Sequence, residues 1–281
     1  MSKNKTPKKP GFFRQLHEEM AQDKKVFTVY MILRVFVLIG IVFTVLGGNY
    51  EGTFFCVLTL LLFLVPSFLE RQLHVQLPTV LEIIILLFIF AAEILGELQG
   101  YYIHIKHWDT MLHTINGFLC AAIGFALVDL LNRNKRVRME LSPLYMAVVA
   151  FCFSMTIGVL WEFFEYGCDK FLLTDMQKDT IIHTIASVDL NPDKVNSAVV
   201  IRNITDVVVN GESLGLGGYL DIGLNDTMKD LLVNFIGAVV FSVIGFFYVR
   251  KRGEGGGFAA NFIPVVEEEP SEDPQTSAEE V

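Results

Sequence analysis

Cysteine and charge are both scarce in this sequence. Its 281 residues include four cysteines, Cys56, Cys120, Cys152 and Cys168, and only 19% of the residues are charged. The cysteines lack the C-x-x-C spacing of a thiolate zinc site or redox pair, and three of them lie in hydrophobic runs, where cysteine is a common small buried residue. The sequence therefore argues against a disulfide framework and against a zinc site built from thiolates.

Common nucleotide-binding and nucleophile motifs are missing as well. The sequence contains no P-loop, no dinucleotide fingerprint and no serine nucleophile elbow. The glycine-rich run at 253–257 follows the last hydrophobic run and has no strand–turn–helix context, so we interpret it as a linker. Neither terminal segment has the pattern of a nucleic-acid-binding region, and we expect membrane lipid rather than nucleic acid as a partner.

Long hydrophobic runs are what the sequence has in abundance. Hydrophobic residues make up 52% of the chain, 24 of them are phenylalanine, and the mean hydropathy is +0.48. A span of the ~30 Å hydrocarbon core needs about 20 apolar residues in a row. Six runs approach this length: 26–46, 53–69, 79–98, 110–131, 143–165 and 229–249. The prediction is an all-α, polytopic transmembrane helix bundle with about six spans.

Lysine and arginine predict how these spans are oriented. The first 25 residues are basic, the loop at 132–142 is basic, and Arg250-Lys251-Arg252 closes the last run, whereas the loops between them carry few bases. Because basic loops stay in the cytoplasm, both termini are predicted to be cytoplasmic. The membrane is predicted to be a bacterial cytoplasmic membrane. The predicted parts are a basic segment 1–25, a membrane domain 26–252 with extracytoplasmic loop 169–228, and a disordered acidic tail 253–281.

Two local structures are predicted inside the long loop. Val207–Val209 precede Asn210-Gly211, a pair typical of tight hairpin turns, so we expect a β-hairpin there. Residues 176–188 have the pattern of a short amphipathic helix.

Three polar runs border or enter the hydrophobic runs at helical spacing. They are Asp109-x-x-x-His113, Trp161-Glu162-x-x-Glu165-Tyr166 and Asp226-x-x-x-Asp230-x-x-x-Asn234. Residues at i,i+3 and i,i+4 share one helix face. Ionisable groups in a membrane span cost at least ~2.5–3.5 kcal/mol each, so they indicate function. Counted from the cytoplasmic end of its span, each run lies about 28–30 Å away, near the outer boundary. Glu97 falls at the same level in the third span.

The same three runs, in order, resemble the YjdF-like family of multi-pass bacterial inner-membrane proteins. The corresponding residues are Asp109, His113 and Gly117; Trp161, Glu162, Glu165 and Tyr166; and Asp226, Thr227, Asp230, Gly237 and Ala238. The resemblance covers roughly residues 80–250, and the sequence departs from the family pattern at Met228-Lys229. It implies a fold and a location but no activity, because the family is essentially uncharacterised.

Three functions fit the predicted layer of polar groups. The first is a structural or ligand-binding scaffold at the outer leaflet. The second is a metal-dependent hydrolase or transferase acting on a lipid or lipid-linked substrate, and the third is an ion- or proton-coupled transporter. Asp109, His113, Glu162, Glu165, Asp226 and Asp230 are the candidate catalytic residues and the candidate ligands of a divalent metal ion. The sequence leaves the choice between enzyme and non-enzyme, the substrate and the oligomeric state open.

Overall fold

A computed structural model describes residues 24–73, 75–133, 141–250, 261–262 and 265–266. The predicted basic segment 1–25 and acidic tail 253–281 lie almost wholly outside these residues. The described chain is mostly helical, and six of its helical stretches are long and apolar enough to cross a membrane. This confirms the predicted polytopic helix bundle.

The six spans follow the predicted hydrophobic runs closely. They are α2 (Lys24–Leu46), α3 with α4 (Tyr50–Leu62 and Val65–Leu73), α5 with η1 (Thr79–Phe90 and Ala91–Leu98), α7 (Trp108–Arg133), α8 (Pro143–Leu172) and α9 (Leu224–Arg250). The hydroxyl of Ser142 accepts a hydrogen bond from the Tyr145 N–H (3.2 Å), and Pro143 occupies the first turn, so α8 begins with a favourable cap.

Two spans are less regular than the hydrophobic pattern predicts. The second is interrupted by a turn between α3 and α4, and the third changes from an α-helix to the π-helix η1 at Ala91. A π-helix is rare and occurs frequently at functional sites. Here η1 carries Glu93 and Glu97.

The outside of the bundle is apolar, as expected of helices surrounded by lipid. Large side chains that no other part of the described chain covers include Phe43 (73% exposed), Leu46 (81%) and Phe163 (67%). A soluble protein rarely leaves so much contiguous apolar surface uncovered. Polar side chains show the opposite trend, since Glu162, Asp230 and Asn234 are all buried.

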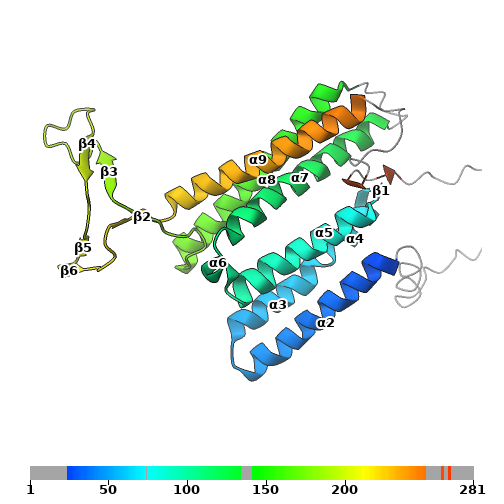
Figure 1. Cartoon of the computed structure of the whole chain (residues 1–281), viewed down its shortest axis with the longest axis horizontal. Helices are drawn as coiled ribbons and strands as arrows, with labels where there is room; N and C mark the ends of the chain where they lie inside the picture. The colour runs from blue at the N-terminus through cyan, green and yellow to red at the C-terminus, as the bar shows by residue number, and fades with distance from the viewer. Residues whose placement is uncertain (1–23, 74, 134–140, 251–260, 263–264, 267–281) are drawn as a thin grey trace, which may run out of the picture.

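The spans form two groups (Figure 1). One group contains α2, α3, α5 and η1, and the other contains α7, α8 and α9, which pack most extensively on one another. We call the second the three-helix group. The groups meet where α7 contacts α5, η1 and the short helix α6 (Tyr101–His104).

Glycines bring α7 and α9 into backbone contact. A Cβ added at Gly117 would overlap the backbone carbonyl of Asn234, and a Cβ added at Gly237 would overlap the carbonyl oxygen of Thr114. Small residues allow this close approach in membrane helices. The contact places the first turns of both helices side by side at one end of the three-helix group.

The long connection between α8 and α9 extends beyond that same end (Figure 1). Its strands pair antiparallel as β2 with β7 (Ile181–Ile182 and Tyr219–Leu220), β3 with β4 (Thr184–Ser187 and Val199–Arg202) and β5 with β6 (Val208–Val209 and Glu212–Ser213). The β5–β6 pair, with Asn210 and Gly211 at positive φ in its turn, confirms the predicted hairpin. The prediction of an amphipathic helix over 176–188 is wrong, because this stretch contains no helix and includes the strands β2 and β3.

At the other end of the molecule, the last described residues return to the helices. β8 (Val265–Val266) pairs with β1 (Val75–Gln76), and Phe262, 5% exposed, joins the hydrophobic core. The Phe262 ring lies edge-on to Phe118 of α7, with centroids 5.2 Å apart.

Candidate functional site

The first turns of α7 provide a carboxylate and an imidazole on one helix face. Asp109 and His113 are four residues apart, and the Asp109 Oδ1 lies 3.3 Å from the His113 Nε2. The side chain of Asp109 is 25% exposed and that of His113 is 12% exposed. The pair therefore lies at the edge of the bundle, with His113 deeper than Asp109.

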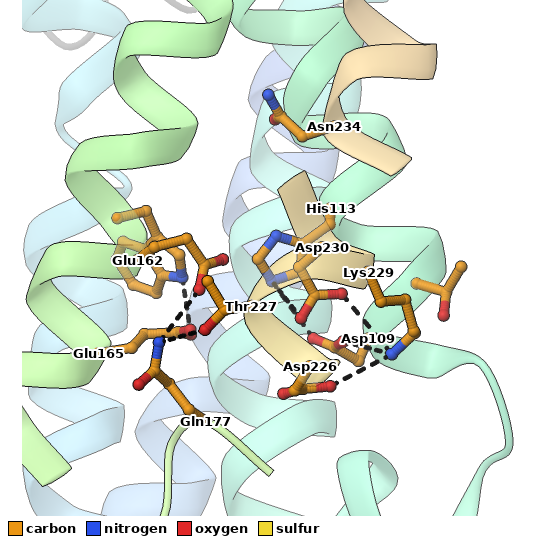
Figure 2. A network of polar contacts seen from close by, with 12 residues as sticks. Asp109, His113, Glu162, Glu165, Gln177, Asp226, Thr227, Lys229, Asp230 and Asn234 are labelled. Atoms are coloured by element: carbon orange, nitrogen blue, oxygen red, sulfur yellow. Dashed lines mark hydrogen bonds and ion pairs between the residues drawn. The ribbon is translucent and has the colours of Figure 1, made fainter. Parts of the chain in front are cut away.

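The first turns of α9 bring two more carboxylates and an ammonium to this pair. Asp230 is 2% exposed, and its Oδ2 lies 4.0 Å from the same His113 Nε2. The Lys229 Nζ lies 3.4 Å from Asp109 Oδ2, 3.3 Å from Asp226 Oδ1 and 3.6 Å from Asp230 Oδ1. Lys229 thus links the acidic groups of α7 and α9 (Figure 2).

Two buried glutamates come from the last turns of α8. Glu162 is 4% exposed and Glu165 is 8% exposed, although both lie on a helix whose neighbouring aromatic residues face outward. The indole N–H of Trp161 donates to Glu165 Oε1 (2.8 Å). Trp161 is itself 42% exposed, so this hydrogen bond joins a buried carboxyl group to the outer surface of the bundle.

Residues 174–180, which we call the strap, lie across the ends of α8 and α9. The side-chain amide of Gln177 donates to Glu162 Oε2 (3.3 Å) and to Thr227 Oγ1 (2.6 Å), and Gln177 is 9% exposed. Asp169, one turn beyond Glu165, accepts hydrogen bonds from the N–H groups of Met176 (2.7 Å) and Gln177 (2.8 Å). Figure 2 shows Gln177 entering between the helices from the strap.

Two further aspartates fix the second half of the strap. Asp226 Oδ2 accepts the N–H of Lys178 (2.9 Å), while Asp221 Oδ1 accepts the N–H of Thr180 (2.8 Å). Asp221 also accepts N–H groups from the residues that begin α9, Gly223 (3.3 Å) and Asn225 (3.0 Å). Burial raises the pKa of the Asp221 carboxyl, but these hydrogen bonds outweigh it and hold that pKa below its ordinary value.

A buried amide network lies one turn beneath the ionisable groups. The Asn116 Nδ2 donates to Asn234 Oδ1 (3.2 Å), and the Asn234 Nδ2 faces the sulfur of Met155 (3.6 Å). Asn234 is 1% exposed, and a Cβ at Gly158 would lie 2.7 Å from its Nδ2. The floor of the site is therefore neutral and tightly packed.

All six residues predicted from the sequence lie at one end of the three-helix group. Asp109, His113, Asp226 and Asp230 are in direct contact or connected through Lys229. Glu162 is linked to α9 through Gln177, and Glu165 is hydrogen-bonded within its own helix. The structure thus shows that the six residues lie close together. Their roles as metal ligands or catalytic residues stay predictions.

Glu97 of the third span was predicted at the same level as the site, and Tyr102 of the short helix α6 follows it closely in the sequence. Burial raises the pKa of the Tyr102 hydroxyl above its ordinary value, and four surrounding carboxyl groups raise it further: Glu97, Asp109, Glu93 and Glu165. The Tyr102 ring packs against η1, since a Cβ added at Gly96 would overlap it. Glu97 itself is exposed.

Sequence reasoning missed Gln177, Thr227 and Lys229 as parts of the site. Lys229 stands inside the Asp226–Asp230 run, where a base among acids on one helix face was a usable signal. Gln177 had no such signal, because it lies in the long loop, outside the three polar runs. Only the folded connection between α8 and α9 brings it to Glu162.

The fold and this site define a polytopic α-helical membrane protein with buried polar groups at one end of three spans. The family described as "Predicted membrane protein (DUF2238)" matches residues 29–251. This range covers all six spans except the first turn of α2. The chain belongs to this family.

A relative of this chain is an "Uncharacterized protein" of Thermotoga maritima (strain ATCC 43589 / DSM 3109 / JCM 10099 / NBRC 100826 / MSB8). It is 26% identical over 107 residues, which are 38% of this chain and 53% of that protein. The chain thus spans about half the length of the curated relative it matches. No solved structure matches the chain.

Proposed function

We propose that this protein resides in the bacterial cytoplasmic membrane and binds a small cationic ligand at the outer face, between α7, α8, α9 and the strap. Both termini then lie in the cytoplasm. The resemblance to YjdF-like inner-membrane proteins is compatible with membership of the DUF2238 family and supports this location.

The excess of acidic groups carries the proposal. Five carboxyl groups, Asp109, Glu162, Glu165, Asp226 and Asp230, share this end of three helices with Lys229 and His113, while Asp169 and Lys170 in the last turns of α8 add one charge of each sign. Three of the five are buried, at 4%, 8% and 2% exposure. Buried anionic charge that lacks a countercharge is costly, so the site is stabilised either by a bound cation or by protons.

The strap supports a role in ligand binding rather than in packing alone. Three aspartates and Glu162 hold this short segment of backbone over the site through hydrogen bonds to its N–H groups and to Gln177. A ligand that binds these carboxyl groups competes directly with the strap.

Thermal unfolding with different cations tests the proposal. The detergent-purified, chelator-treated protein is heated with a divalent metal ion, with a small organic diamine, or with sodium alone. A cation that binds the folded state at 100 times its Kd stabilises it by about 2.7 kcal/mol. We expect at least one small cation to raise the melting temperature, and we expect Glu162→Gln with Asp230→Asn to remove the rise.

The matched control for this test is Asp189→Asn with Glu212→Gln. Both residues are exposed and lie on the loop beyond the strap, so the pair removes the same number of charges far from the site. The control must keep the full stabilisation. If no cation stabilises the wild type, protons neutralise the buried carboxyl groups and the proposal is wrong.

Orientation is tested separately by thiol labelling in whole cells. In a variant whose four cysteines are replaced by alanine, Ser197→Cys places a thiol on the exposed β3–β4 connection, and Ser277→Cys places one in the acidic tail. A membrane-impermeant maleimide should label position 197 in intact cells and position 277 only after permeabilisation. The reverse pattern would contradict an outward-facing site.

A hydrolase or transferase that acts on a lipid headgroup is the second candidate. The observation that favours it is the Trp161–Glu165 hydrogen bond, which connects the outer surface of α8 with a buried carboxyl group. Release of a labelled headgroup from lipid nanodiscs, lost in Glu165→Gln and retained in the control pair, would establish this activity. The transport hypothesis gains less support, because the five carboxyl groups lie at one end of the spans.

A further inference from the structure

The donor atoms of the site converge on one nitrogen. The His113 Nε2 lies 3.3 Å from Asp109 Oδ1 and 4.0 Å from Asp230 Oδ2. One donor atom from each residue lies within 4.8 Å of both others, and among the described residues these three form the group of histidine, cysteine and acidic side chains that could hold a metal ion.

The separation of 3.3 Å matches an edge of a coordination polyhedron, and the separation of 4.0 Å is longer than such an edge. Ligand atoms bound to one ion at about 2.0–2.2 Å lie about 2.8–3.6 Å apart when they are neighbours, and about 4.0–4.4 Å apart when they are opposite. The two distances at His113 fall within or between these values. A displacement of a few tenths of an ångström would bring all three donors into contact with a single ion.

The Lys229 ammonium lies beside the outer oxygen of each carboxylate, at 3.4 Å from Asp109 Oδ2 and 3.6 Å from Asp230 Oδ1. Asp109 Oδ2 and Asp230 Oδ1 face the Lys229 ammonium, whereas Asp109 Oδ1 and Asp230 Oδ2 face His113 (Figure 2). Lys229 therefore holds both groups from one side and leaves the oxygens on the His113 side available. Partner groups outside the ligand set commonly orient metal ligands in this way.

Asp230 supplies an independent indication of a missing ligand. The residue is 2% exposed, and its Oδ1 accepts no hydrogen bond in the described structure. The Lys229 ammonium, at 3.6 Å, is the nearest countercharge but lies beyond hydrogen-bond distance. A buried carboxylate whose second oxygen has no donor is costly, and a cation bound at Oδ2 would offset part of that cost by neutralising the charge of the carboxylate.

We propose that Asp109 Oδ1, His113 Nε2 and Asp230 Oδ2 bind one divalent first-row metal ion, with Lys229 positioning the two carboxylates. The inference rests on the proposed cation-binding function and names its ligand class. One imidazole and two carboxylates form a mixed N/O donor set, which suits Mn²⁺ or Fe²⁺. Three protein donors leave further coordination positions to water or to a substrate.

The experiment titrates the full-length, chelator-treated protein in detergent with Mn²⁺. Free Mn²⁺ is followed by its electron paramagnetic resonance signal, and the bound ion is examined by electron spin-echo modulation for coupling to a histidine nitrogen. We expect about one Mn²⁺ per chain and a nitrogen coupling that His113→Gln abolishes. Asp230→Asn should weaken binding at least ~10-fold, and the Asp189→Asn control should leave it unchanged.

Folding of each variant is checked by size-exclusion chromatography and thermal unfolding in the absence of metal. If Asp230→Asn does not fold, the nitrogen coupling of the wild-type complex decides the question without a variant. Absence of stoichiometric binding, or a bound ion without nitrogen coupling, overturns the inference.

The results also distinguish failure of the metal site from failure of the proposed cation-binding function. Stabilisation by a small diamine without Mn²⁺ binding leaves the cation-binding function standing and rejects the metal site. Failure of every cation to stabilise the protein rejects both.

Discussion

Gln177 is the residue through which the connection between α8 and α9 enters the site. Its side-chain amide is shared between Glu162 of α8 and Thr227 of α9, and its backbone N–H is held by Asp169. One residue outside the spans thereby joins two helices that are far apart in the sequence. Gln177 is neutral, so it satisfies Glu162 without cancelling the charge that attracts a cation.

Gln177→Ala should loosen the strap while leaving the helices in place. The change removes two hydrogen bonds and leaves the buried Glu162 without this donor, at a cost of about 1–3 kcal/mol. Hydrogen–deuterium exchange of the peptide covering the strap should accelerate by about tenfold or more, which corresponds to about 1.4 kcal/mol. Gln99→Ala, at an exposed glutamine, is the matched control, and equal acceleration in both variants would contradict the role of Gln177.

Asp221 should make the attachment of the strap dependent on pH. Its hydrogen bonds place its folded-state pKa below the ordinary value, so the stabilisation is complete above about pH 4, the unfolded value, and is lost as the pH falls through the lower folded value. Exchange at Thr180 and Asn225, corrected for intrinsic rates, should rise only in that acidic window. Asp221→Asn should raise exchange already at neutral pH and flatten the acidic step; an unchanged step would exclude Asp221 as its source.

At the scale of elements, the crossing of α7 and α9 determines whether a site forms at all. Gly117 and Gly237 let the two backbones touch, and Asp109, His113 and Asp230 lie within two turns of that contact. A larger residue at the crossing would separate the helices and move the donor atoms apart. Because the contact is a property of both helices, neither hydrophobic run reveals it alone.

Gly237→Ala should therefore destabilise the protein although alanine is the better helix former. The added Cβ overlaps the carbonyl of Thr114, and overpacking of this kind costs about 1–3 kcal/mol. Thermal unfolding in detergent should show a lower midpoint. Gly167→Ala on α8 is the control, since no atom lies within 4 Å of its added Cβ, and helix propensity there favours alanine by up to about 1 kcal/mol. Equal effects at both positions would rule out the close approach.

The elements themselves were largely predictable. The hydrophobic runs anticipated the six spans, since length and composition alone decide whether a helix can cross the hydrocarbon core. The β5–β6 hairpin was predictable from Asn210-Gly211, where positive φ favours these residues. The prediction of a helix at 176–188 was wrong because strand pairing overrides the local pattern: β2 pairs with β7, which is distant in sequence, and β3 pairs with the next strand, β4.

At the scale of the whole molecule, the chain closes on itself at the end opposite the site. Phe262 enters the core beside Phe118 of α7, and β8 pairs with β1, which precedes α5. The last described residues therefore link the core around α7 with the segment that precedes α5, and the two helix groups contact each other mainly where α7 meets α5, η1 and α6.

Phe262→Ala should weaken the association of the C-terminal residues with the helices. Loss of a buried phenylalanine ring costs up to about 3–5 kcal/mol. We expect a lower thermal midpoint and faster hydrogen exchange in the β1 peptide. Phe171→Ala, which removes a ring that is 81% exposed, should change neither. An unaffected midpoint for Phe262→Ala would show that this ring contributes little to holding the molecule together.

The sequence by itself determined the membrane-spanning helices and the level at which polar groups accumulate, because hydropathy and helical spacing are local properties. It also identified Asp109, His113, Glu162, Glu165, Asp226 and Asp230 as candidates. Only the tertiary structure decided which donor atoms meet, that Lys229 bridges the acids of α7 and α9, and that Gln177 connects the strap with Glu162. The contact of Lys229 with Asp109 joins residues 120 positions apart, and Gln177 reaches Glu162 only through the fold of the connection between α8 and α9, so no local pattern encodes either contact.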